Sequence, residues 1–134
     1  MYFPYGEKEI SYLKQKDKRL SEVIDQIGII KRKVDDDLFS SVIHHIVGQQ
    51  ISTKAQETIW YRMNSRFHTI EPEEILDAGI DCLQSFGVTF RKAEYIYDFA
   101  RKVHEGKFDL EDIRKQTDEK AVRTLASLRG IGIW

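Results

Sequence analysis

The chain has 134 residues, the length of one ordinary domain, with 41% hydrophobic and 32% charged residues. Only two prolines and eight glycines are present, and no run approaches the ~18 apolar residues of a membrane span, so a disordered chain and a membrane protein are excluded. The net charge of −1 is not that of a strongly basic nucleic-acid-binding domain, so any such partner would be held by local donors.

The N-terminal segment is predicted to form two helices, at about residues 7–15 and 18–27, because its apolar residues are spaced by three, four and seven. Asp17 is the expected cap between them, and Gly28 is a natural stop. Residues 29–36 are predicted to be a loop. The acidic run Asp35-Asp36-Asp37 at the end of this loop lacks the oxygen spacing and the glycine of a calcium-binding loop, so we expect it to cap the next helix.

A buried helix is predicted from Leu38 to the segment Gly48-Gln49-Gln50-Ile51, and Ser52 is the expected cap of the next helix, which reaches about Phe67. Two helices that meet at a Gln-Gln corner place long polar side chains at a break. These amides either satisfy neighbouring backbone carbonyls or project outward, where one of them can fill the space of a displaced base in a duplex.

The second half is predicted to contain short helices at 71–79 and 81–86, a long one at 90–105 capped by Thr89, and two more at about 110–116 and 119–128. Asp109 and Asp118 are the expected caps of the last two. No segment has the alternation of a strand. The predicted fold class is therefore all-α.

A glycine turn, Gly130-Ile131-Gly132, follows the last of these helices. Glycines permit positive φ, and free N–H groups at such a turn bind a phosphate oxygen directly or through a cation. A simple helix C-cap remains the alternative interpretation of this pattern. Two further pairs are ambiguous: His44-His45 favours structural histidines over a metal site, and Arg91-Lys92 fits either a solvated face or a phosphate contact.

Three blocks of sequence carry a family resemblance: FSSVIHHIVGQQISTKA at 39–55, GVTFRKAEYIYDFA at 87–100 and LASLRGIGIW at 125–134. In order and spacing they resemble the helix-hairpin-helix (HhH-GPD) DNA glycosylases of the 3-methyladenine glycosylase II type. The resemblance implies a multi-helix orthogonal array, truncated after the hairpin. It also implies one helical domain over 1–134, with N-terminal helices at 1–28 and a helical subdomain at 37–134.

The resemblance also assigns roles to individual residues. Gly130 and Gly132 correspond to hairpin glycines whose backbone binds DNA phosphate through a monovalent cation, K⁺ or Na⁺. Gln50 corresponds to the residue that wedges into the duplex, and Trp134 to a tryptophan that stacks on the flipped base. The expected DNA-contact set is Arg129, Gly130, Ile131, Gly132, Gln50 and Ser52.

The implied activity is base-excision repair: a monofunctional N-glycosylase that flips alkylated, 3-methyladenine-type purines out of double-stranded DNA and hydrolyses them from the sugar. The family's catalytic aspartate lies one helix beyond the hairpin, hence beyond Trp134, so no catalytic residue is assigned and the fragment is expected to be inactive alone. The alternatives are a non-enzymatic helix-hairpin-helix DNA-binding module and a helical interaction domain.

Cofactors, location and assembly are predicted more broadly. Cys82 is the single cysteine, so this segment cannot hold an iron–sulfur cluster, and no cofactor is expected beyond the hairpin cation. The first residues lack a charged and then apolar leader, so we expect a cytoplasmic protein. In the family the helices at 1–28 pack on C-terminal ones; without these, exposed apolar residues are expected to drive self-association.

Overall fold

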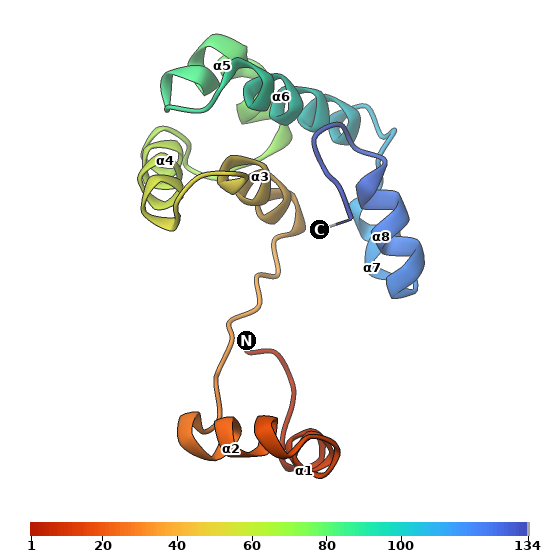
Figure 1. Ribbon diagram of the computed structural model, residues 1–134. Helices are drawn as coiled ribbons and strands as arrows, with labels where there is room; N and C mark the ends of the chain where they lie inside the picture. The colour runs from red at the N-terminus through yellow and green to blue at the C-terminus, as the bar shows by residue number, and fades with distance from the viewer. Residues whose placement is uncertain (134) are drawn as a thin grey trace. The chain divides into compact units, whose positions relative to one another are not determined.

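The computed structural model describes residues 1–133 (Figure 1). The regular elements in that range are helices, and its β pairing is limited to one isolated bridge between Tyr2 and Lys33. The predicted all-α class is confirmed. The chain divides into two compact units, Met1–Asp36 and Asp37–Trp134. Among residues 1–133, no helix is both long and apolar enough to span a bilayer.

The first unit contains α1 (Glu7–Lys16) and α2 (Lys18–Ile27), as the helical spacing predicted. Asp17 separates them and caps α2, because its side chain accepts a hydrogen bond from the backbone N–H of Leu20 at 3.0 Å. The segments on either side of the two helices are joined by backbone pairing, with the Phe3 N–H donating to the Arg32 carbonyl at 2.8 Å.

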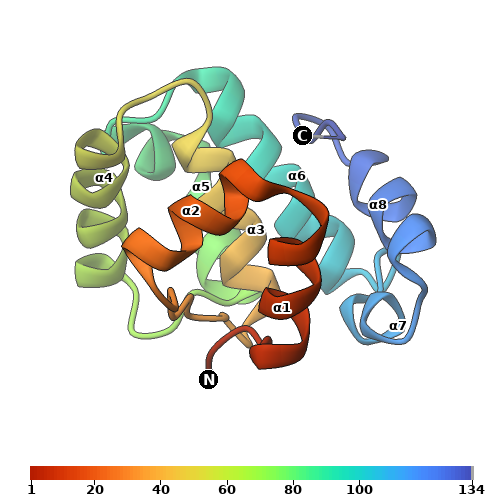
Figure 2. The ribbon, with the colours of Figure 1, turned by 60° about the horizontal axis from the view of Figure 1, so that its bottom comes forward.

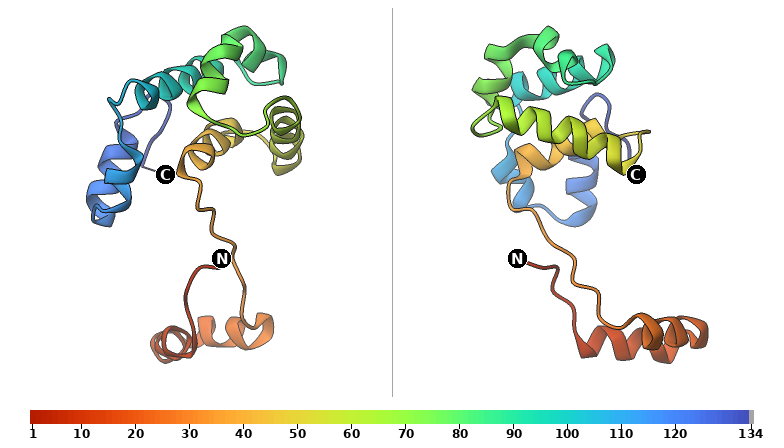
Figure 3. Two further views of the ribbon diagram at one scale, coloured as in Figure 1. Left: turned by 180° about the vertical axis from the view of Figure 1, so that it is seen from behind. Right: turned by 90° about the vertical axis from the view of Figure 1, so that its left-hand side faces the viewer.

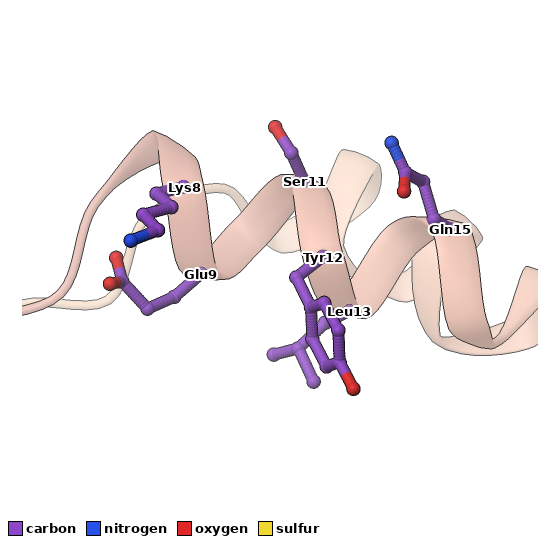
Figure 4. A pocket seen from close by; sticks show the side chains of 6 residues that line it. All are labelled: Lys8, Glu9, Ser11, Tyr12, Leu13 and Gln15. Atoms are coloured by element: carbon purple, nitrogen blue, oxygen red, sulfur yellow. The ribbon is translucent and has the colours of Figure 1, made fainter.

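The first unit has almost no interior of its own. Neither α1 nor α2 contains a buried side chain. Figure 4 shows that Tyr12 and Leu13 project from one side of α1 and that Ser11 and Gln15 project from the other. The large apolar side chains that this unit exposes are Met1, Tyr2, Phe3, Tyr12, Leu13, Leu20, Val23, Ile27, Ile29, Ile30 and Val34.

The second unit holds six helices among its described residues: α3 (Leu38–Gly48), α4 (Thr53–Arg66), α5 (Pro72–Ser85), α6 (Phe90–His104), α7 (Leu110–Arg114) and α8 (Asp118–Ala126). Most begin where a local cap was predicted. The side chains of Asp37, Ser52, Thr89 and Asp109 each accept a backbone N–H at the start of α3, α4, α6 and α7.

Two details differ from the predicted helices. α8 is capped by Thr117, whose hydroxyl accepts the Lys120 N–H, and Asp118 is the first helical residue instead of the cap. This arrangement keeps two acids, Asp118 and Glu119, in the first turn, where the helix dipole favours them. α7 ends at Arg114, two residues earlier than predicted. In α5, Gly79 has φ 81° and a non-helical conformation, which confirms the predicted break between two short helices there.

The core of the second unit lies where α3, α5 and α6 meet. α5 packs along α6, α3 packs on both α4 and α6, and α7 packs against α8 (Figures 1, 2 and 3). The aromatic centre is Phe99, whose ring stacks on Phe39 at 5.2 Å and meets Phe108 edge-on at 5.9 Å. Fully buried side chains such as Ile43, Ile46, Ile75, Leu83 and Ile96 each contribute roughly 1.5–3 kcal/mol. This core fixes the two segments that form the site, which are the corner between α3 and α4 and the turn after α8.

Candidate nucleic-acid interface

The α3–α4 corner projects a glutamine from a strained backbone. α3 ends at Gly48, Gln49 turns to an extended conformation, and Gln50 has φ 57°. Gln50 is the one residue other than glycine that has a positive φ in the described chain. Its side chain is exposed. A long side chain held at such a position is a feature that clusters at functional sites, because the surroundings must maintain the conformation.

Lys92 on α6 is hydrogen-bonded to this corner. It lies in the first turn of α6, and its ammonium group donates to the Val47 carbonyl at 3.0 Å and to the Gln49 carbonyl at 2.6 Å. Both acceptors belong to the C-terminal end of α3, where carbonyls lack helical partners and the helix dipole favours a cation. Burial lowers the pKa of Lys92 from its ordinary value of 10.5.

The turn after α8 packs on the same helix. Gly130 has φ 86°, and a Cβ atom added there would lie 2.3 Å from Cδ2 of Tyr95 on α6. Glycine is therefore required at this position both for the backbone conformation and for the contact with the ring. Before the turn, Arg129 places its guanidinium carbon 5.5 Å from the centre of the Tyr95 ring.

A direct hydrogen bond joins the corner to the turn. The side-chain amide of Gln49 donates to the Gly130 carbonyl at 2.6 Å, across 81 residues of sequence. Together the two segments border a cavity of about 810 Å³. Its lining combines backbone, amides and cations: His45, Gln49, Gln50, Ile51, Thr89, Arg91, Lys92, Tyr95, Gly130 and Gly132. The structure thus brings together Gln50 and both hairpin glycines.

The remaining predicted site residues lie around this cavity. Ile131 is half-buried against the core and donates its N–H to the Leu128 carbonyl at 3.2 Å. Gly132 is exposed, and nothing lies within 4 Å of a Cβ added to it. Ser52 caps α4 by accepting the Ala55 N–H at 3.1 Å, which leaves its hydroxyl proton free to donate elsewhere. Trp134, the predicted base-stacking residue, lies outside the described residues.

Several pairs that were ambiguous in the sequence separate in the structure. His44 is half-buried with its ring 4.7 Å from that of Trp60, whereas His45 is exposed and borders the cavity. Lys92 is half-buried and bonded to carbonyls, whereas Arg91 is exposed. Arg91 therefore offers a cation at the rim, and Lys92 serves the corner. Gln49 satisfies a backbone carbonyl, one of the two alternatives that the sequence left open, whereas the role of Lys92 was missed by sequence reasoning.

The cavity has no acidic lining residue among the residues described. A second, apolar hollow of about 280 Å³ is bordered by α3, α8 and Ile133, and the described residues that line it also include no carboxylate. Nor does the described chain contain three histidine, cysteine or acidic side chains grouped to hold a metal ion. The chemistry available at the interface is therefore hydrogen-bond donation, positive charge and stacking.

Comparison with known proteins places this arrangement. YfjP of Bacillus subtilis, which bears a provisional name as a DNA-3-methyladenine glycosylase, is 25% identical over 123 residues, covering 86% of this chain and 43% of that protein. A crystal structure of a DNA-3-methyladenine glycosidase from Bacillus halodurans is 27% identical with a TM-score of 0.80, covering 100% of this chain and 63% of that one.

A third relative shares the fold: the Schizosaccharomyces pombe 3-methyladenine DNA glycosylase Mag1, in complex with abasic DNA, has a TM-score of 0.77 at 21% identity, over 96% of this chain and 66% of that one. The chain thus spans less than half the length of the curated relative it matches. The family model of the HhH-GPD superfamily base excision DNA repair proteins matches residues 43–131, which include the Gln50 corner, Lys92 and Gly130. The chain belongs to the HhH-GPD superfamily of base excision DNA repair proteins.

Proposed function

We propose that the chain is the DNA-binding and base-flipping part of a monofunctional glycosylase that removes 3-methyladenine-type alkylated purines from double-stranded DNA. The observation that carries the proposal is that Gln50, in its left-handed conformation, borders the same cavity as Gly130 and Gly132. Backbone N–H groups at the turn bind a phosphate, and Gln50 enters the duplex beside it, filling the space of the extruded base.

The charges at the cavity favour this division of labour. Arg91, which lines the cavity, and Arg129, which precedes the glycine turn, are exposed cations available to phosphates that flank the flipped nucleotide. With a net charge of −1, the chain as a whole does not attract DNA, so binding depends on these local groups. We therefore propose weak, salt-sensitive binding to DNA.

The proposed substrate follows from the chemistry of alkylation and from the names of the relatives at 25% and 27% identity. A purine alkylated at a ring nitrogen is cationic and leaves readily, and it stacks favourably on an electron-rich indole, the role proposed for Trp134. Hydrolysis then needs a carboxylate to stabilise the developing positive charge on the sugar. Since no carboxylate lines either hollow, we propose that these 134 residues bind DNA without releasing the base.

The monovalent cation belongs to the same proposal. Gly130 uses one lone pair of its carbonyl for the Gln49 amide, and the second remains for a cation; Gly132 is open on its outer side. Such an ion would supply positive charge between the turn and a phosphate. Replacing K⁺ by tetramethylammonium at equal ionic strength is expected to weaken DNA binding, and equal affinity in both salts would remove the ion from the proposal.

The apolar side chains exposed on α1 and α2 support the proposed self-association of the isolated chain. Sedimentation velocity over a range of concentrations tests this, and a monomer throughout would contradict it. We propose a cytoplasmic location on the separate ground that Cys82 is the single cysteine of the sequence.

The central test compares duplexes with and without a stable abasic-site analogue by fluorescence anisotropy, using the full chain. We expect tighter binding to the abasic duplex, because the flipped state needs no base to be unstacked. Gln50→Ala is expected to abolish the preference, whereas Gln84→Ala, an exposed residue of α5, leaves it unchanged. Equal affinity of the unsubstituted chain for both duplexes would refute the base-flipping proposal and leave a plain DNA-binding module, the alternative favoured by the missing carboxylate.

A further inference from the structure

The Gln50 corner has no means of holding its own conformation. Its backbone at φ 57° is unfavourable for a residue with a side chain, and Gln50 itself is exposed. The closing turn of α3 is loose, since the Gln49 N–H reaches the Ile46 carbonyl only at 3.4 Å. The conformation must therefore be imposed by contacts from elsewhere in the second unit.

Lys92 supplies the first of these contacts. Its two hydrogen bonds end on the carbonyls of Val47 and Gln49, at 3.0 and 2.6 Å, on either side of Gly48. One ammonium group thus fixes the directions of two of the three carbonyls that precede Gln50. Two of its three donors are used in this way, and burial lowers its pKa, as expected for a cation withdrawn from solvent.

Gln49 supplies the second contact. Its carbonyl accepts from Lys92 while its side-chain amide donates to the Gly130 carbonyl at 2.6 Å. Gly130 in turn rests on Tyr95, which lies one helical turn after Lys92 on α6. The corner and the glycine turn are therefore attached both to each other and to neighbouring positions of one helix.

Resting on the proposed function, we propose that Gln49 and Lys92 are positioning residues that link the inserting Gln50 to the phosphate-binding Gly130 turn, so that both reach DNA in one fixed geometry. Neither needs to touch the nucleic acid. The side-chain amide of Gln49 donates a hydrogen bond within the protein, whereas the neighbouring Gln50 is exposed. The ammonium group of Lys92 donates to carbonyls of the α3 end, whereas the neighbouring Arg91 is exposed. Phosphate attraction falls to Arg91 instead.

The link can be tested without DNA. In the isotopically labelled chain, Gln49→Ala is expected to shift the backbone amide signals of residues 130–132, and Lys92→Met is expected to shift those of both residues 50–51 and 130–132. The matched controls Gln84→Ala and Lys115→Met, at exposed positions, should leave these signals in place. Signals at 130–132 that are unmoved by Gln49→Ala would overturn the link. Gln49→Glu, which keeps the shape but not the donor, serves if the alanine variant does not fold.

DNA binding then separates positioning from contact. Each of Gln49→Ala and Lys92→Met is expected to reduce the preference for the abasic duplex about tenfold, with no further loss in the double variant, because both interrupt one link. The salt dependence of binding should be unchanged by Lys92→Met and should fall by about one phosphate contact with Arg91→Met. A reduced salt slope with Lys92→Met would make Lys92 a phosphate ligand and overturn its positioning role.

The two proposals fail differently. If the unsubstituted chain shows no preference for abasic DNA, the proposed function is refuted, while the amide signals still decide whether Gln49 and Lys92 join the corner to the turn. If the preference is present but survives both substitutions, the proposed function stands and the positioning role is refuted.

Discussion

Replacing Gly130 by alanine is expected to destabilise the second unit strongly, for two separable reasons. The backbone at φ 86° is left-handed, which costs an alanine roughly 1–2 kcal/mol. The new Cβ would lie 2.3 Å from Cδ2 of Tyr95 and 2.8 Å from Cγ and Cε2, well inside the contact distance of about 3.5–4.0 Å between carbon atoms. Moving the half-buried ring costs about 1–2 kcal/mol, in the lower part of the range for overpacking. Because Tyr95 is half-buried and can shift, we expect a total loss of about 2–4 kcal/mol.

Urea denaturation followed by tryptophan fluorescence measures this loss. Both tryptophans of the chain, Trp60 and Trp134, belong to the second unit, so the signal reports its unfolding. Gly132→Ala is the matched control, since nothing lies within 4 Å of its added Cβ and its φ is not in the left-handed region; a change within about 0.5 kcal/mol is expected there.

A double-mutant cycle with Tyr95→Ala separates the two costs. Removing the ring should abolish the collision and leave the backbone strain, so the cycle should return a coupling of about 1–2 kcal/mol. A Gly130→Ala loss below about 1 kcal/mol would refute the assigned backbone conformation. A full loss with no coupling to Tyr95 would refute the packing of the turn on α6.

Three further outcomes are expected. Lys92 lines the cavity and has a lowered pKa, as nucleophilic lysines do, but its ammonium group is bonded to two carbonyls and is not available to attack the sugar. Borohydride should therefore trap no covalent adduct with abasic DNA. A cross-link that is lost in Lys92→Met would contradict this. The pKa of Asp98 lies below its ordinary 3.8 because Arg101 donates to it and Lys102 is near. Asp98→Asn should therefore lower the free energy of unfolding by less than about 1 kcal/mol at neutral pH, and this loss should vanish as the pH falls below 3.8 and through the lowered pKa. A loss that does not depend on pH would exclude the ion pair. Thr117→Ala should cost about 1 kcal/mol by loss of the α8 cap, more than Asp118→Ala, and the reverse order would restore Asp118 as the cap.

The helices were predictable because their boundaries are local. Asp17, Asp37, Ser52, Thr89 and Asp109 each bond to a backbone N–H within three residues of themselves, so spacing along the chain contains the whole signal. The prediction was wrong at the start of α8, where Thr117 and Asp118 are adjacent and either is a good cap. Propensity alone does not order two such residues.

The site was predictable only in part, because its internal bonds join distant residues. Gln50 and the glycine turn were indicated by short motifs, but the Gln49–Gly130 and Lys92–Gln49 bonds span 81 and 43 residues. The helical spacing does not separate the two cations. Lys92 lies four residues before the buried Ile96 and eight before Ala100, but Arg91 has the same spacing to Tyr95 and the buried Phe99. Which carbonyls Lys92 meets depends on how α3 packs on α6.

The identity of residue 50 supports the proposal that its side chain acts on DNA. A chain that needed only the turn would place glycine at φ 57°, since glycine adopts this conformation without strain. Gln50→Gly is therefore expected to stabilise the second unit by about 0.5–1 kcal/mol in urea while abolishing the preference for the abasic duplex. Gain of stability with loss of function is the pattern of a residue retained for its side chain. A glycine variant that is less stable, or that still prefers abasic DNA, would show that the strain at Gln50 has no functional cause.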